Sequence, residues 1–346
     1  MRSKKVPPAV LCVVLAACSL GPLVPRTVAQ TRIAIVGSGS NVPINLYTAW
    51  TEEFNKKNPG INVRYLSMST VEGIRQITEG SGDFAAGEVP LTDEQMHGSK
   101  VTVGHIPTVL VAIVPIYKLP GNPVLHFSGE LLAEIFLGSI KTWNDARIQK
   151  LNPGTTLSDQ PIKVVHRTAG KGSNYILTDF LSKTSSEWRS RVGKTPSPNW
   201  PVGEDANRGE DMVEKVSANP GAIGYVELNF ARRADIGYGD VKNAAGNFIR
   251  AAPESIIAAC NATAKSVPAD FRASLANASG KDSYPVSSFT WIYAPLTGLA
   301  AERAQALKQF LDWSLGDGQN IARSLGYATL PPDFLARARK MVNSIQ

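Results

Sequence analysis

Cysteine is scarce in this sequence of 346 residues: there are three, at Cys12, Cys18 and Cys260. The first two lie in an N-terminal stretch with the features of a secretion signal. The single cysteine that remains excludes an internal disulfide, and we interpret Cys260 as a small buried apolar residue rather than a nucleophile. A hydrophobic core must therefore hold the fold together, and the chain is long enough for about two domains.

Long hydrophobic runs are also missing. The apolar stretch Ala9–Ala17 follows a basic start and is far shorter than the roughly 20 residues of a spanning helix, so we interpret residues 1–29 as a secretion signal. Two cleavage sites are consistent with the sequence. Cleavage can follow Ala29, or it can follow a lipobox that ends before Cys18, in which case Cys18 becomes a lipidated N-terminus. We expect a periplasmic or extracytoplasmic protein, lipid-anchored in the second case.

Neither sign of charge is in large excess. The formal net charge is +7, but four of the 36 basic residues lie in the predicted signal, which leaves 32 basic residues against 29 acidic ones. No basic run is interleaved with aromatic residues, so we expect no nucleic-acid partner.

The motifs of common enzyme classes are absent as well. Residues 169–173 lack the first glycine of a P-loop and have glycine after the lysine, and residues 37–42 end in valine where a dinucleotide fingerprint needs glycine. There is no HExxH and no nucleophile elbow. The histidines show no metal-ligand spacing, and we expect surface or capping positions for His97, His105, His126 and His166. We predict no catalysis, no metal and no cofactor.

What the chain does contain is an alternation of β-branched runs and amphipathic stretches. Strands are predicted at 32–36, 61–65, 83–86, 109–115, 162–165, 220–226 and 288–293, and helices at 44–54, 128–136 and 300–315. This pattern predicts an α/β fold with mixed sheets flanked by helices.

Small polar loops stand between predicted strands and helices at residues 40–42, 69–70 and 172–174. In an open parallel sheet, the loops that follow the strands meet at the carboxyl edge of the sheet, where ligands bind. Helix N-termini offer backbone donors and a favourable dipole to an oxyanion, and Arg167, at a strand end, adds a fork of donors. Each loop alone is typical of an ordinary N-cap. Their joint occurrence indicates an anion site.

Four segments resemble the phosphate-binding proteins of the phosphate ABC importer: Gly37–Pro43, Asp83–Glu94, Phe136–Asp145 and Pro220–Glu227. The resemblance runs in order through nearly the whole chain after the signal. It implies a two-lobed periplasmic-binding-protein fold of type II, with phosphate in the interdomain cleft.

The resemblance also implies the ligand residues. It assigns phosphate donors to Asn41, Val42, Thr70, Gly172 and Ser173, makes Arg167 the cation, and makes Glu88 the carboxylate that faces the ligand. Hydrogen phosphate can donate its proton to a carboxylate, whereas sulphate has none at neutral pH. A facing carboxylate therefore rejects sulphate by repulsion.

The sequence departs from the family pattern at several of these positions. The family has Thr-Phe where this chain has Asn41 and Val42, Ser in place of Thr70, and Asp in place of Glu88. In the last loop, the family aspartate that steadies the arginine is gone, and Lys171 replaces a serine. Lys171 either pairs with Glu88 or adds attraction for the ligand. We hypothesise that it lies within reach of the ligand and raises the affinity for doubly charged anions.

The domain organisation follows from the same resemblance. We expect one domain to contain residues 31–107 and 284–346, and the other to contain residues 108–283, so that the chain leaves the first domain and returns. The predicted function is delivery of inorganic phosphate to an importer permease by hinge closure of a monomer. Two alternatives stay open: a carrier of another oxyanion, such as sulphate or molybdate, and a phosphate-sensing homologue not coupled to transport.

Overall fold

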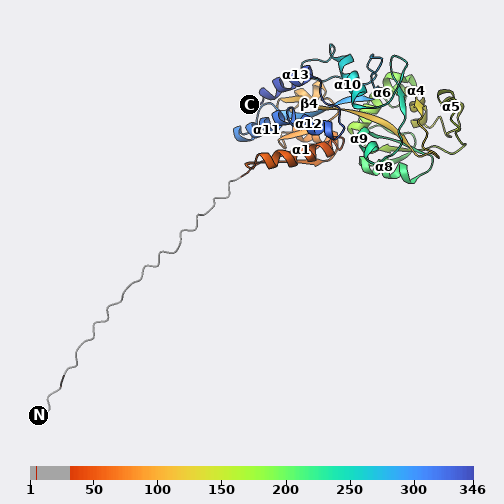
Figure 1. Ribbon diagram of the computed structural model, residues 1–346. Helices are drawn as coiled ribbons and strands as arrows, with labels where there is room; N and C mark the ends of the chain where they lie inside the picture. Colours follow the sequence, from red (N-terminus) through yellow and green to blue (C-terminus); the bar gives the residue numbers. More distant parts are fainter. Residues whose placement is uncertain (1–4, 6–31) are drawn as a thin grey trace. The chain divides into compact units, whose positions relative to one another are not determined.

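The computed structural model describes residues 32–346, together with the isolated Lys5 (Figure 1). The predicted signal, residues 1–29, and the lipidation candidate Cys18 fall outside the described residues. Within the described part, no helix is both long and apolar enough to cross a membrane.

The described chain alternates strands and helices. The strands are β1 (Ile33–Gly39), β2 (Ile61–Ser67), β3 (Phe84–Gly87), β4 (Val103–Tyr117), β5 (His126–Phe127), β6 (Lys163–Arg167), β7 (Glu204–Ala206), β8 (Ala222–Glu227), β9 (Asp240–Lys242), β10 (Phe248–Ile249) and β11 (Ser287–Pro295). The helices are α1 (Ile44–Lys57), α2 (Thr70–Thr78), α3 (Asp93–His97), α4 (Gly129–Phe136), α5 (Ala146–Leu151), α6 (Gly172–Thr184), α7 (Ser186–Arg191), α8 (Gly209–Ala218), α9 (Leu228–Arg233), α10 (Pro253–Thr263), α11 (Ala301–Ser314), α12 (Gly318–Ser324) and α13 (Pro332–Asn343).

One eight-stranded sheet organises the fold, in the order β2-β1-β3-β11-β4-β8-β6-β7, and a small sheet has the order β10-β9-β5. Strands β2, β1 and β3 are parallel to one another, as are β8, β6 and β7. The two crossing strands between these groups, β11 and β4, are antiparallel to their neighbours. The predicted α/β class with mixed sheets flanked by helices is confirmed.

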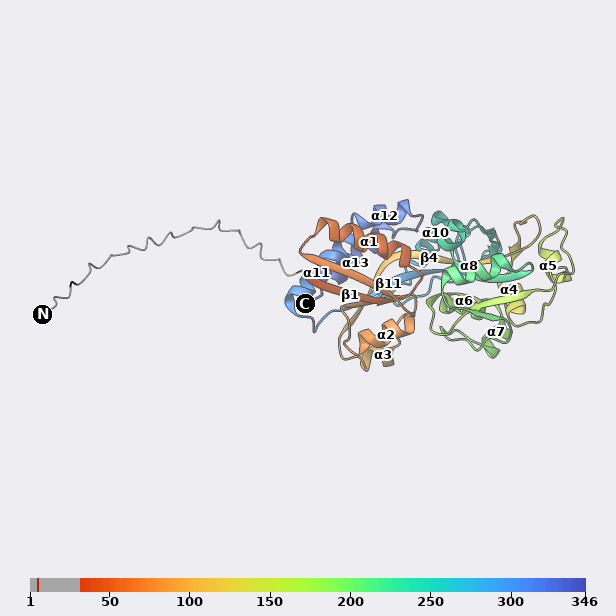
Figure 2. The same ribbon diagram turned by 90° about the horizontal axis from the view of Figure 1, so that it is seen from below.

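The crossing strands divide the helices into two groups. Figures 1 and 2 show α1, α11, α12 and α13 on the side of β1, and α4, α5, α6 and α8 on the far side of β4. We call the elements around β2-β1-β3 the β1 half and those around β8-β6-β7 the β6 half. All 15 residues of β4 are buried, because this strand pairs with β11 in its first part and with β8 in its last.

Local sequence accounts for the helices beside the sheet. Leu46, Tyr47, Trp50 and Phe54 recur at helical spacing in α1 and are all buried. Helix α2 begins where the Ser69 hydroxyl accepts a hydrogen bond from the Glu72 N–H at 3.1 Å, which satisfies one of the free donors of the first turn.

Two expectations from the sequence were wrong. The strand predicted at residues 109–115 extends over Val103–Tyr117 and includes Pro107. The register between β4 and β11 shifts directly after Pro107 and leaves Thr108 unpaired, and proline is found in sheets next to such bulges. His105 and His166 are buried rather than at the surface; Nε2 of His105 accepts a hydrogen bond from the Leu91 N–H at 3.1 Å.

Gly39 ends β1 in a conformation that other residues rarely adopt. Its φ is +138°, and a Cβ atom there would lie 2.2 Å from the carbonyl oxygen of Ala86 on β3. We expect Gly39→Ala to lower the free energy of unfolding by about 2–3 kcal/mol. Urea denaturation measures this, with Gly60→Ala as the control because no atom lies within 4 Å of a Cβ at Gly60. Equal stability of the two variants would contradict the prediction.

Candidate anion-binding site

The parallel strands of the β1 half deliver three polar loops to one edge of the sheet. Gly39 of β1 pairs with Ser67 of β2 and with Ala86 of β3, so the three strands end at the same level. Residues 40–42 follow β1, Ser69 and Thr70 follow β2, and Glu88 follows β3 directly. The sheet register therefore brings together side chains that are up to 48 residues apart, as the bond from the Ser40 hydroxyl to Glu88 shows.

The β6 half adds a strand end and a helix start to the same place. Arg167 is the last residue of β6, opposite Ala206 at the end of the parallel strand β7. Four residues later Lys171 takes the N-cap position of α6, with φ −93° and ψ 138°, and Gly172 begins the helix.

The two halves are in direct contact at this edge. Gly209 N–H, at the start of α8, donates to Oδ1 of Asn41 at 3.0 Å, and Val71 N–H donates to the carbonyl of Gly170 at 3.2 Å. A Cβ atom on Gly172 would lie 1.9 Å from Oε2 of Glu88. Only glycine allows the start of α6 to approach this carboxyl group so closely.

The Glu88 carboxyl group is fully buried and accepts hydroxyl donors from three elements. Ser40 donates to Oε2 at 2.7 Å, Thr70 reaches the same oxygen at 3.4 Å, and Thr290 of β11 donates to Oε1 at 3.1 Å. Burial raises the pKa of Glu88 to about 7, although these hydrogen bonds and the charge of Arg167 act to lower it. Near neutral pH this group can therefore accept a proton or donate one.

The start of α6 is a second feature suited to an anion. The N–H groups of its first turn have no acceptor within the helix, and the dipole of this 13-residue helix favours negative charge there. The hydroxyl of Ser173 is buried, and it has no hydrogen-bond partner among residues 32–346. Donors at this place are thus available to a ligand.

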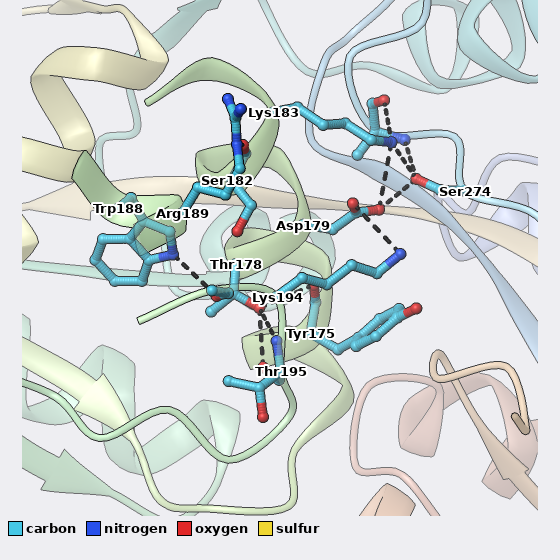
Figure 3. Close-up of polar contacts among 12 residues, drawn as sticks. Tyr175, Thr178, Asp179, Ser182, Lys183, Trp188, Arg189, Lys194, Thr195 and Ser274 are labelled. Carbon is cyan, nitrogen blue, oxygen red and sulfur yellow. Dashed lines mark hydrogen bonds and ion pairs between the residues drawn. The ribbon is translucent and has the colours of Figure 1, made fainter. Parts of the chain in front are cut away.

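A polar cluster further along α6 connects this helix to neighbouring segments (Figure 3). The buried Asp179 lies 3.4 Å from Nζ of Lys194 and 3.5 Å from Nζ of Lys183, and it accepts a hydrogen bond from Ser274. Lys183 also donates to Oγ of Ser274 at 2.7 Å, which ties α6 to the segment before β11.

Comparisons with known proteins identify the family of this chain. The sequence profile of the PBP superfamily domain matches residues 24–317. The phosphate-binding protein PstS of Xylella fastidiosa (strain Temecula1) is 34% identical, with 90% of this chain and 85% of that protein covered. PstS of Pasteurella multocida is also 34% identical, with coverages of 90% and 89%. The chain belongs to the PstS family of phosphate-binding proteins. The predicted family is confirmed.

Solved structures of PstS-like proteins share the fold. A putative phosphate ABC transporter substrate-binding protein with bound phosphate from Clostridium perfringens aligns with a TM-score of 0.62 at 19% identity, covering 86% of this chain and all of that one. A phosphate-binding protein from Stenotrophomonas maltophilia aligns with a TM-score of 0.65 at 18% identity, with coverages of 89% and 93%.

In this PstS family member the predicted ligand residues gather at one edge but differ in what they contact. Thr70, Glu88 and Gly172 touch one another, and Asn41 contacts the β6 half. The N–H of Val42 donates to the Ser40 hydroxyl at 3.1 Å. Two residues of the candidate site were not predicted from the sequence: Thr290, which contacts Glu88, and Asn207, which contacts Arg167 and Lys171.

No carboxylate replaces the missing family aspartate beside Arg167. Its guanidinium donates instead to the carbonyl oxygens of Ala206 at 3.2 Å and Asn207 at 2.8 Å. Lys171 does not pair with Glu88, since its Nζ donates to Oδ1 of Asn207 at 2.8 Å. Among residues 32–346 neither cation forms an ion pair, and no group of three His, Cys, Asp or Glu residues is arranged to hold a metal.

The raised pKa of Glu88 makes folding depend on pH in a defined direction. The ordinary pKa of 4.5 applies to the unfolded chain, so the neutral carboxyl favours the folded state below about pH 4.5, and this contribution is lost as pH rises through about 7. We expect the free energy of unfolding of Glu88→Gln to rise relative to that of the wild type by about 2–3 kcal/mol between pH 5 and pH 8, because only the wild type loses the neutral carboxyl over this range. Urea denaturation across this range measures the difference.

Glu72→Gln is the matched control for this measurement. Hydrogen bonds from Arg75 lower the pKa of the exposed Glu72 to about 2, so any effect of its removal has the opposite dependence on pH. A stability difference between wild type and Glu88→Gln that stays constant with pH would contradict the assignment.

Proposed function

We propose that this chain binds inorganic phosphate outside the cytoplasm and delivers it to the permease of an ABC importer. Family membership supports the proposal, because its relatives carry the name phosphate-binding protein. The observation that carries it is the meeting of three groups from two halves of the sheet: the buried Glu88 carboxyl, the N-terminus of α6, and the buried Arg167 guanidinium without a carboxylate partner.

These groups have complementary tasks toward a phosphate ion. Arg167 and the first-turn N–H groups at Gly172 and Ser173 donate to the phosphate oxygens, and the Ser173 hydroxyl adds a donor. Asn41, Val42 and Thr70 form the opposing wall. Glu88 accepts the proton that hydrogen phosphate carries, so a fully deprotonated tetrahedral anion meets a repelling oxygen instead. Lys171 adds positive charge beside Arg167 and raises the affinity for doubly charged anions.

Binding between the two halves would favour a closed conformation. We assign residues 31–107 and 284–346 to one domain and residues 108–283 to the other, with β4 and β11 as the connections. The bulge at Thr108 lies at this boundary, where the irregular ladder between β4 and β11 offers a natural bending point. A ligand that contacts both halves stabilises the closed state by its differential affinity. The closed monomer then docks on the permease.

The site holds a ligand without transforming it. Its hydrogen-bond donors and its one carboxyl group suit the holding of an anion, and the relatives are named as binding proteins, which supports a carrier rather than an enzyme. The extracytoplasmic location, with or without a lipid at Cys18, belongs to the same proposal.

Calorimetry with a panel of anions tests the ligand. We expect wild-type protein to bind phosphate and to leave sulphate and molybdate unbound at about pH 8, where Glu88 is ionised. Arg167→Ala removes charge-assisted donors from a buried site and should weaken phosphate binding by about 100-fold. Arg191→Ala, which removes an exposed arginine paired with Glu187, should leave it unchanged. Tighter binding of sulphate or molybdate than of phosphate would contradict the proposal.

Small-angle scattering tests the closure. We expect saturating phosphate to decrease the radius of gyration of the wild type, because contacts such as Asn41 to Gly209 join the two halves only when they close. Arg167→Ala at the same phosphate concentration should keep the larger radius. A wild-type radius that does not change at saturation would rule out hinge closure on the ligand.

A further inference from the structure

Asn207 connects the two basic side chains of the site. It follows β7 and lies two residues before α8 begins at Gly209. Its carbonyl oxygen accepts from Nη2 of Arg167 at 2.8 Å, and its side-chain Oδ1 accepts from Nζ of Lys171 at 2.8 Å. Thr168 donates to the same Oδ1 at 3.3 Å. One exposed residue thus orients both cations through two different oxygens.

Both cations are nine-tenths or more buried: Arg167 is 3% exposed and Lys171 9%. Neither cation forms an ion pair with a carboxylate of residues 32–346, although the charge of Asp211, which pairs with Arg208 at 3.3 Å, acts on both of them. Burial, followed by the charge of Arg167, lowers the pKa of Lys171. Two buried like charges that share only neutral acceptors are costly in the free protein. An anion between them would remove this cost.

We propose that Asn207 sets the affinity for the hydrogen phosphate dianion by holding Lys171 and Arg167 with neutral oxygens, so that the positive charge of both side chains acts on the ligand. This inference rests on the proposed phosphate site and adds a residue from the β7–α8 connection. An amide orients the ammonium group as an aspartate would, but it does not neutralise it.

The test compares Asn207→Asp with Asn207→Ala. If Asn207 acts through its lack of charge, Asn207→Asp weakens phosphate binding more; if it acts only through its shape and hydrogen bond, Asn207→Ala does. Asn207→Asp keeps the shape and the acceptor but adds a negative charge beside both cations. Asn207→Ala removes the side-chain acceptor and keeps the carbonyl oxygen. At about pH 8.5, where phosphate is mainly the dianion, we expect calorimetry to give 10- to 100-fold weaker binding for Asn207→Asp and less than 10-fold weaker binding for Asn207→Ala.

Stability provides an independent readout. Asn207→Asp supplies a counter-ion to two buried cations, so the free protein should unfold at a higher temperature than the wild type even though it binds phosphate less tightly. In a Lys171→Gln background the loss of affinity caused by Asn207→Asp should shrink at least threefold. Asn219→Asp, which adds the same charge to the groove that Asn207 lines, is the control and should change the phosphate affinity less than threefold.

The possible results distinguish a failure of the proposed function from a failure of the proposed role of Asn207. A wild type that fails to bind phosphate refutes the proposed function. A wild type that binds phosphate while Asn207→Asp binds it equally well, or better than Asn207→Ala does, refutes the role of Asn207 and leaves the function standing. A lowered unfolding temperature of Asn207→Asp would likewise overturn the charge argument.

Discussion

The carboxyl group of Glu88 lies where the two parts of the sheet meet, and its burial constrains everything around it. Three hydroxyl groups from Ser40, Thr70 and Thr290 must face it, because a buried carboxyl without donors would destabilise the fold. The start of α6 must be glycine, because Gly172 lies against Oε2. Thr290 belongs to the crossing strand β11, so the Glu88 carboxyl group is hydrogen-bonded to an element that connects the two halves.

The two basic side chains of the candidate site are held by uncharged acceptors. Arg167 and Lys171 are buried, and within residues 32–346 no carboxylate pairs with them; neutral oxygens of Ala206 and Asn207 accept their hydrogen bonds instead. Carbonyl and amide oxygens orient a cation without cancelling its field. In the proposed function, an anion bound beside these two side chains would remove the electrostatic cost of burying them, so that ligand binding would stabilise the folded protein.

The parts of this structure that depend on neighbours in sequence could be predicted, and those that depend on distant contacts could not. The alternation of strands and helices and the polar loops around Asn41 and Thr70 follow from periodicity and turn residues, and the burial of Cys260 follows from the usual behaviour of a lone cysteine. Thr290 reaches Glu88 across 202 positions, and no local pattern distinguishes it from other strand threonines. The acceptor of Lys171 was equally hidden, since it depends on the pairing of β6 with β7. Pro107 hid the first part of β4, because only the pairing with β11 creates the bulge that accommodates it.

The burial of Cys260 makes selective labelling of the protein surface possible. Its thiol is fully buried, and burial raises its pKa to about 12, so it stays protonated and out of reach of labelling reagents at neutral pH. Within residues 32–346 it is the one cysteine. A cysteine introduced at Met68, which is exposed beside the start of α2, would therefore react alone. An environment-sensitive dye attached there would turn this fold into an optical sensor.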